Sequence, residues 1–337
     1  MKLRMRQAIA LALADEMRRD SRVVVFGEDI AVAEGPFKTS EGLLAEFGAN
    51  RVRDTPISEM GFIGAAVGAA ATGLRPVAEI MFIEFLGVAL DQLVTEASKF
   101  RYLSGGAYNV PLVVRASVGC GLGFGMQHSQ TLETWFYATP GLKLVVPSGA
   151  RTAYGLLRAA IQDEDPVVVL EPRVLYAERE EVIVGDAGII PIGVGEILRP
   201  GSDVTVVALG QMVGHAIAAV NVANWSAEVI DLRTLIPWDR QMVCESVSRT
   251  GRLVIVEESP FSGGWGTEIA SYVGTECFKD LKAPIHRITC PDVPVPYPAH
   301  LEQRFLPSVE YVRSQISAVV SNNASPKPWW VTEGYMS

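Results

Sequence analysis

Apolar runs and amphipathic stretches alternate along most of the chain. Short runs rich in Val, Ile and Leu that are bounded by turn residues predict buried strands, and apolar residues at helical spacing predict helices. In the first half, strands are predicted at 23–27, 76–82, 111–117, 142–146 and 166–170. Helices are predicted at the N-terminus and at 60–73, 85–102 and 149–162. This alternation indicates a mostly parallel sheet covered on both faces.

The same alternation begins again after residue 200. It consists of strands at 203–209, 227–232, 251–257 and 285–289 and helices at 211–223, 239–248, 263–279 and 308–321. Between the two series, 177–200 is irregular and rich in Gly and Pro, which indicates a linker. We therefore predict two parallel-sheet α/β domains, 1–176 and 201–321, in this chain of 337 residues. The tail, 322–337, is polar, and Trp329 and Trp330 are expected to be exposed in it.

Composition and charge narrow the class of protein. A hydrophobic content of 49% with 20% charged residues describes a soluble globular chain. The net charge of −9 argues against nucleic acid or an anionic membrane as the main partner. The four cysteines are widely spaced and form no CxxC pair, which indicates free buried thiols in a reducing cytoplasm. The N-terminal segment is amphipathic rather than a signal peptide, and no apolar run approaches the ~20 residues of a membrane span.

One stretch, 54–73 (DTPISEMGFIGAAVGAAATG), combines an acid with small residues. Glu59 lies between a Pro turn and a helix made almost wholly of Gly, Ala and Val. A carboxylate in such apolar surroundings is costly unless something pairs with it. Glycines weaken the helix but allow a backbone or a flat ligand to approach closely. A buried core helix with a capping acid and a ligand-binding helix are both open on this stretch alone.

A glycine-rich loop follows the strand at 111–117, with glycines at every second residue from Gly119 to Gly125. This spacing does not fit the G-x-G-x-x-G fingerprint of dinucleotide sites, so a mobile or ligand-contacting loop is favoured. The loop leads to His128, one of only four histidines. Ser129 lies next to it but on no G-x-S-x-G elbow, which argues against a Ser-His hydrolase. The chain contains no P-loop pattern either.

Several segments together carry a family resemblance. In the first half they are FGEDI, TSEGLLAEFG, RVRDTPISEMGFIGAAVGAAATGLRPVAEIMF, DQLVTEASKFRYLSGG, QHSQ and PGLKLVVPS, and in the second VIDLRTLIPWD, GRLVIVEE and GGWGTEI. Over about residues 5–315 the chain resembles the beta subunit of the thiamine-diphosphate-dependent 2-oxoacid dehydrogenases. That subunit belongs to the decarboxylating component of the pyruvate, branched-chain and acetoin dehydrogenase complexes.

The resemblance implies a pyrimidine-binding domain followed by a transketolase C-terminal domain. It implies that Glu59 hydrogen-bonds a ring nitrogen of the cofactor's aminopyrimidine and that Phe85, after the strand at 76–82, stacks on that ring. His128 matches the active-site histidine that exchanges protons with substrate-derived groups and the incoming lipoyl group. Ile57 and Met81 match pocket walls. A possible potassium site of some relatives matches the backbone carbonyls of Leu112, Ala160, Asp163 and Asp165.

One absence implies a partner. Thiamine enzymes hold the diphosphate through magnesium on a G-D-G stretch with a following Asn, and this sequence contains no GDG. The resemblance therefore implies an alpha subunit that brings Mg²⁺ and the diphosphate half of the site, in a heterotetramer of two alpha and two beta chains. The glycine-rich face of the helix at 60–73 would be a close subunit contact.

The resemblance also implies a lipoyl acyltransferase partner, but two features leave alternatives. The loop GCGLGFGM is richer in glycine than in the pyruvate and acetoin branches, and the tail after 322 matches nothing in the family. A stand-alone two-subunit carboligase or transketolase-like enzyme is the second interpretation. A non-catalytic scaffold is the third, although Glu59, Phe85 and His128 together argue against it. The sequence does not distinguish pyruvate, branched-chain oxoacids and acetoin.

Overall fold

The computed structural model describes residues 1–334, and the chain forms two compact units. Unit 1 comprises Met1–Gly119, Trp135–Gly193 and Thr234–Pro237, and unit 2 comprises Cys120–Thr134, Val194–Arg233 and the chain from Trp238 on. Each unit contains a mostly parallel sheet with helices on both faces, which confirms the predicted α/β class. The chain changes unit five times, after residues 119, 134, 193, 233 and 237.

Unit 1 is built on a sheet that has seven strands within residues 1–334. In spatial order they are β12 (Thr234–Ile236), β6 (Lys143–Val145), β7 (Val167–Pro172), β5 (Val113–Val118), β4 (Arg75–Ile80), β2 (Val23–Gly27) and β3 (Val52–Asp54). All neighbouring pairs are parallel except β12 with β6. The central strands are buried on both faces, because helices cover both sides. A small antiparallel pair joins β1 (Lys2–Arg4) to β8 (Arg179–Glu181).

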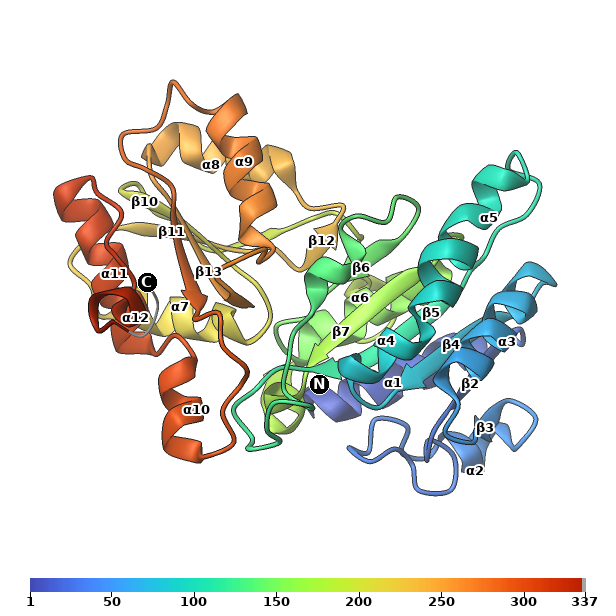
Figure 1. Ribbon diagram of the computed structural model, residues 1–337. Coiled ribbons are helices and arrows are strands. Elements are labelled where there is room, and N and C mark those ends of the chain that lie inside the picture. The colour runs from blue at the N-terminus through green and yellow to red at the C-terminus, as the bar shows by residue number, and fades with distance from the viewer. Residues whose placement is uncertain (335–337) are drawn as a thin grey trace. The chain divides into compact units, whose positions relative to one another are not determined.

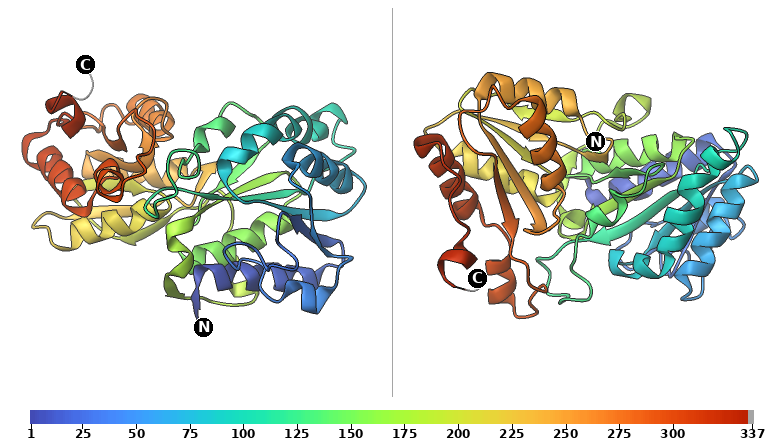
Figure 2. Two further views of the ribbon diagram at one scale, coloured as in Figure 1. Left: turned by 60° about the horizontal axis from the view of Figure 1, so that its bottom comes forward. Right: turned by 45° about the horizontal axis from the view of Figure 1, so that its top comes forward.

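Helices cover the two faces of this sheet differently. On one face lie α1 (Met5–Arg19) and α6 (Ala150–Gln162). On the other lie α3 (Glu59–Ala71), α4 (Ile83–Asp91), the π-helical η1 (Gln92–Ala97) and α5 (Ser98–Leu103) (Figure 2). The last three form one helical rod, close to the single helix predicted at 85–102, and the π-turn in its middle was not predicted. The short helices are α2 (Leu43–Phe47), η2 (Glu133–Phe136), η3 (Arg173–Ala177) and η4 (Asp186–Gly188).

Unit 2 repeats this layering around a smaller sheet. Within residues 1–334 its strands are β14 (His286–Cys290), β13 (Leu253–Pro260), β10 (Val204–Ala208), β11 (Ala227–Asp231) and β9 (Glu196–Arg199), in that spatial order. Only β9 is antiparallel to its neighbour. The helices α7 (Gln211–Asn221) and α11 (Val309–Asn322) pack on one face, and α8 (Arg240–Thr250) and α9 (Gly266–Glu276) lie on the other (Figure 1). The short helices are α10 (Ala299–Phe305) and α12 (Trp329–Thr332).

The tail corrects one prediction. The expectation that Trp330 is exposed is wrong, because its side chain is only 2% exposed. The tail returns over unit 2, where the Arg304 guanidinium lies 4.4 Å from the centre of the Trp329 ring and the Ser325 hydroxyl is 2.8 Å from Nδ1 of His286. Composition misled the prediction because these partners lie at least about 25 residues earlier in the chain, beyond the reach of a local pattern. Residues 335–337 lie outside the described part.

Two further expectations can be compared with the structure. The stretch 177–200, predicted to be a linker, contains β8 near its start and β9 near its end. The four cysteines are free thiols, as predicted; three of them are buried, whereas Cys244 is only half-buried. Among residues 1–334, no helix is long and apolar enough to cross a membrane.

Candidate functional site

The carboxyl ends of three neighbouring strands of unit 1 carry most of the predicted site residues. Glu28 follows β2, Thr55 follows β3 and Met81 follows β4. Because β3, β2 and β4 are parallel neighbours, their carboxyl ends lie at the same edge of the sheet. Open α/β sheets bind ligands at this edge. The structure therefore places Ile57, Glu59, Met81 and Phe85 on elements that leave one sheet edge.

Glu59 is the first residue of α3, and its side chain is buried. The N-terminus of a helix favours a negative charge through the helix dipole. Glu28 lies close enough to interact electrostatically with it: burial, followed by the negative charges of Glu59 and Asp29, raises the pKa of Glu28. Two acids thus share a partly desolvated region at the sheet edge.

Within residues 1–334, one acid of this pair and a threonine at the same sheet edge each have a polar atom without a hydrogen-bond partner. Among the described residues, neither Oε1 of Glu28 nor Oγ1 of Thr55 has a hydrogen-bond partner, although both atoms are buried. Buried polar atoms without partners are rare in folded proteins and need an explanation. Glu28 and Thr55 therefore join Glu59 as candidate ligand-binding residues at this edge of the sheet.

The apolar candidates are more open than the acids. Phe85 lies in the first turn of α4, which begins at Ile83, two residues before the predicted helix start at 85. Its ring is half-buried and packs edge-on against Phe82, with the ring centres 5.6 Å apart. Met81 is half-buried, and its carbonyl accepts a hydrogen bond from the Ser117 hydroxyl. Ile57 is 85% exposed, so it is not a pocket wall within this chain alone.

Sequence reasoning missed a buried charge network within the same sheet. The Arg115 guanidinium on β5 bonds both carboxylate oxygens of Glu171 at 2.7 and 2.9 Å, and it bonds Glu79 at 2.7 Å. The Tyr176 hydroxyl donates to Glu171 at 2.8 Å, and the Thr39 hydroxyl donates to Glu79. One signal was available: Arg115 is the single charged residue of β5 and Glu171 is the single charged residue of β7, and buried charges require partners. The network cross-links β4, β5 and β7.

His128 belongs to the segment Cys120–Thr134 of unit 2, whereas Glu59 and Phe85 belong to unit 1. Its side chain is half-buried, and its backbone N–H donates to the Gly125 carbonyl at 3.2 Å. The glycine-rich loop therefore ends in a turn directly before the histidine.

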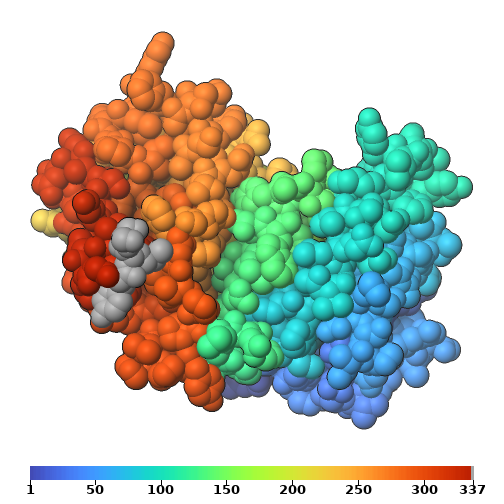
Figure 3. Space-filling view, in the orientation of Figure 1, coloured from blue at the N-terminus to red at the C-terminus, as the bar shows by residue number. Residues whose placement is uncertain are grey.

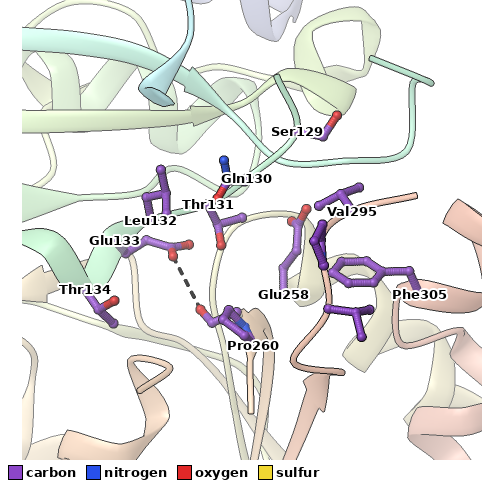
Figure 4. A pocket seen from close by; sticks show the side chains of 13 residues that line it. Ser129, Gln130, Thr131, Leu132, Glu133, Thr134, Glu258, Pro260, Val295 and Phe305 are labelled. Carbon is purple, nitrogen blue, oxygen red and sulfur yellow. Dashed lines mark hydrogen bonds between the residues drawn. The ribbon is translucent and has the colours of Figure 1, made fainter. Parts of the chain in front are cut away.

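A small cavity of about 110 Å³ lies within unit 2 beside this segment (Figure 4). Its walls include the stretch from Ser129 to Thr134, Glu258 to Pro260 and Phe305. The Ser259 hydroxyl donates to the buried carboxyl of Glu133 at 3.3 Å, the contact dashed in Figure 4. Burial raises the pKa of Glu133 to about 8, and the negative charge of Glu258 acts in the same direction. Burial therefore favours the neutral form of the Glu133 carboxyl.

The four carbonyls predicted for potassium lie around one end of α6. Ala160 is in its last turn, Asp163 caps it, Asp165 follows, and Leu112 precedes β5. The Leu112 carbonyl accepts from the Val167 N–H at 2.9 Å, and the Asp163 carbonyl accepts from Arg75 at 2.9 Å. A carbonyl oxygen has a second lone pair, so these bonds leave it able to coordinate a cation. Backbone carbonyls are the type of donor that binds K⁺ in proteins.

Part of the α3 surface is uncovered and apolar. Met60 is 54% exposed, and Gly61, Ala65 and Gly68 are exposed on α3; Val88 of α4 is 62% exposed. Further along the rod, α5 and the following loop stand out from the surface of unit 1 (Figure 3), and Tyr102 on α5 is 90% exposed. Apolar exposure of this kind marks interaction surfaces.

Comparisons with known proteins identify the two domains and the family. The family profile for the transketolase pyrimidine-binding domain matches residues 1–179, and that for the transketolase C-terminal domain matches residues 193–312. The chain is 45% identical to the pyruvate dehydrogenase E1 component subunit beta of Rhizobium meliloti over 93% of its own length and 69% of the relative's. It is 40% identical to the 2-oxoisovalerate dehydrogenase subunit beta of Bacillus subtilis, over 91% and 95%.

Solved structures show the same architecture. A split-gene transketolase, described as an inactive beta4 tetramer, has a TM-score of 0.78 and 25% identity over 95% of this chain and 99% of its own. A transketolase from Pichia stipitis shares the fold with a TM-score of 0.68 at 16% identity, over 95% of this chain and 46% of its own. The chain therefore belongs to the family of beta subunits of the 2-oxoacid dehydrogenase E1 component, built from the transketolase pyrimidine-binding and C-terminal domains.

Proposed function

We propose that this chain supplies the pyrimidine-binding half of a thiamine diphosphate site in a two-subunit enzyme. The enzyme decarboxylates a pyruvate-like 2-oxo acid or cleaves acetoin, and it passes the acyl group to lipoamide on an acyltransferase partner. The observation that carries the proposal is Glu59 at the start of α3, a buried acid at the same sheet edge as the unsatisfied atoms of Glu28 and Thr55. The named relatives, pyruvate and 2-oxoisovalerate dehydrogenase beta subunits, support the reaction class.

The roles of the side chains follow from their chemistry. Bound thiamine diphosphate supplies the electron sink for the bond that breaks. Glu59 hydrogen-bonds a ring nitrogen of the pyrimidine, and partial burial keeps this bond strong. Phe85 offers a ring face for stacking, and Met81 contributes an apolar wall. His128 exchanges a proton with substrate-derived groups and the lipoyl group, a task suited to imidazole near neutral pH.

The partner follows from what this chain lacks. Its sequence has no GDG stretch to hold the diphosphate through Mg²⁺, so we assign that half of the site to an alpha subunit. The uncovered face of α3, with the 85% exposed Ile57 at its start, supports a close subunit contact there. We propose a heterotetramer of two alpha and two beta chains, with K⁺ at the carbonyls near the end of α6 as a structural ion.

The test of the cofactor role is Glu59→Ala, assembled with the alpha partner. We expect 2-oxoacid turnover to fall by at least about 100-fold, the usual scale for losing a group that acts on a proton, while the assembly keeps its size on gel filtration. Glu41→Ala, an exposed acid of the same unit, is the matched control. Normal turnover in the Glu59 variant would remove the basis of the assignment.

The split-gene transketolase, which this chain matches over 95% of its length, supports a second candidate: a carboligase or ketol transferase without a lipoyl partner. The two reactions separate cleanly in one experiment. The assembled enzyme is given a lipoylated acyltransferase domain and a 2-oxo acid, and acylation of the lipoyl group is followed by mass spectrometry. No acylation, together with ketol products from added aldehydes, would favour the second candidate.

A further inference from the structure

The glycine-rich loop that precedes His128 has an unusual backbone. Gly119, Gly121, Gly123 and Gly125 all have positive φ, between 72° and 106°, and they alternate with residues of negative φ. Positive φ at every second residue turns the backbone of this loop so that N–H groups of alternate residues can face one acceptor, and concave runs of backbone N–H groups bind anions. The spacing of the glycines at every second residue therefore has a structural purpose different from dinucleotide binding.

The anion in this concavity is a side chain of the same unit. Glu302, on α10, accepts hydrogen bonds from the N–H groups of Gly121 at 2.8 Å and of Gly123 at 3.0 and 3.3 Å. Its side chain is only 4% exposed. A second carboxylate, Glu258 on β13, accepts from the Cys120 N–H at 2.7 Å. Hydrogen bonds to a carboxylate are about twice as strong as those between neutral groups.

Apolar contacts hold the same two segments together. Phe305, three residues after Glu302, packs in a buried cluster with Cys120, Cys290 and Val295. At the far end of the loop, the Tyr297 ring lies so close to Gly125 that a Cβ there would be 3.0 Å from it. The loop is thus fixed at its start, middle and end by residues of unit 2 from Glu258 to Phe305.

We propose that Glu302 is a positioning residue: its carboxylate fills the backbone concavity of the glycine-rich loop and thereby sets the position of His128. The link is short, because His128 lies shortly after Gly123 in the chain and the Gly125 carbonyl binds the His128 N–H. The catalytic part of this inference rests on the proposed function of His128, whereas the anchoring of the loop does not.

The first measurement is hydrogen exchange of the loop in the full-length chain, alone and with its alpha partner. In Glu302→Gln the peptide covering 119–128 should exchange roughly tenfold faster than in the natural chain, because the charged acceptor is lost. Peptides from β10 and β13 should be unchanged, which shows that unit 2 stays folded. Glu310→Gln, an exposed acid on α11, is the matched control.

A second variant changes the backbone of the loop and leaves the Glu302 side chain in place. Gly123 has a φ of 72°, and a Cβ there would meet nothing within 4 Å, so Gly123→Ala adds only backbone strain. It should loosen the same peptide. Gly263→Ala is the control, because Gly263 has a similar φ of 70° and equal space in another loop of unit 2.

The second measurement is steady-state kinetics of the assembled enzyme. Glu302→Gln and Gly123→Ala should lower kcat by roughly tenfold and leave the apparent KM for thiamine diphosphate within about twofold, since the pyrimidine-binding residues lie in unit 1. Unchanged exchange in both variants would overturn the anchoring. Faster exchange with an unchanged kcat would overturn the positioning of His128. If the natural assembly has no 2-oxoacid activity, the proposed function fails, and the exchange data still decide the anchoring.

Discussion

At the scale of single residues, the structure separates acids that look alike in the sequence. Glu59 opens a helix at the ligand-binding edge of a sheet, Glu302 accepts backbone N–H groups, and Glu133 is buried beside a small cavity. Glu133 has a pKa of about 8, mainly because burial disfavours its charged form. The same residue type therefore serves as a candidate catalytic group, an anchor and a core residue whose neutral form is favoured.

The raised pKa of Glu133 predicts a pH-dependent stability. Between its ordinary pKa of 4.5 and about 8, the folded chain holds a proton that the unfolded chain releases. Stability therefore falls as pH rises through this window, by about 1.4 kcal/mol per pH unit at most. In Glu133→Gln this loss should disappear, so the variant gains about 2 kcal/mol relative to the natural chain between about pH 6.5 and pH 8.

Urea unfolding of both chains at the two pH values measures this difference. The range from about pH 6.5 to pH 8 avoids the titration of His286. Burial lowers the pKa of His286 to about 4, so this residue changes the stability mainly in more acid solutions. Glu268→Gln, an exposed acid on α9, should leave the pH dependence of the natural chain unchanged. A parallel pH dependence in Glu133→Gln and the natural chain would show that Glu133 is ionised when folded.

At the scale of elements, the hydrophobic pattern predicted those strands and helices whose buried residues recur at regular spacing within the element itself. The run at 23–27 is β2 at the predicted bounds, and the helix at 149–162 is α6 to within one residue. Elements that depend on distant partners were missed. β12 has only three residues, too few for a period, and it forms because β6 offers an edge. Glu302 lies 181 residues from Gly121 in the loop it anchors, so the glycine spacing alone could not name the anion.

The exposed face of helix α3 allows a test of whether the alpha subunit packs there. Gly68 is exposed in its interior, and a Cβ there would meet nothing within 4 Å. Gly68→Ala should therefore stabilise the isolated chain by about 0.5–1 kcal/mol, because alanine loses less conformational entropy in a helix. If the alpha subunit packs closely on this face, the added methyl group should also weaken assembly by several-fold.

Gly214 in α7 provides the control, because it too is an exposed helix glycine at which an added Cβ would meet nothing within 4 Å. Gly214→Ala should give the same gain in thermal stability and leave assembly unchanged. Titration of each variant with the alpha chain, followed by analytical ultracentrifugation, compares the two. Equal assembly of both variants would place the partner on another face.

At the scale of the whole molecule, each of the two units is built from segments that are not contiguous in the sequence. The sequence pattern predicted two domains joined once, at 177–200, yet the segment Cys120–Thr134 lies in unit 2 and Thr234–Pro237 lies in unit 1. Neither of these two segments can be assigned to its unit from the sequence pattern, because a short loop and a three-residue strand have no hydrophobic periodicity. His128 therefore lies in unit 2, although the strand before it in the chain, β5, belongs to unit 1.

Because each unit contains segments from both sides of residue 193, the two pieces should stay associated when the chain is cut there. A protease site introduced between Gly193 and Val194, where Val194 is 43% exposed, would divide the chain near the predicted linker. The two pieces should elute together in native buffer, because β12 of the second piece pairs with β6 of the first, and Gly121 of the first bonds Glu302 of the second. They should separate in urea. Two peaks in native buffer would mean that these contacts do not hold the pieces together, whereas joint elution would show that tertiary contacts keep the two pieces associated without chain connectivity.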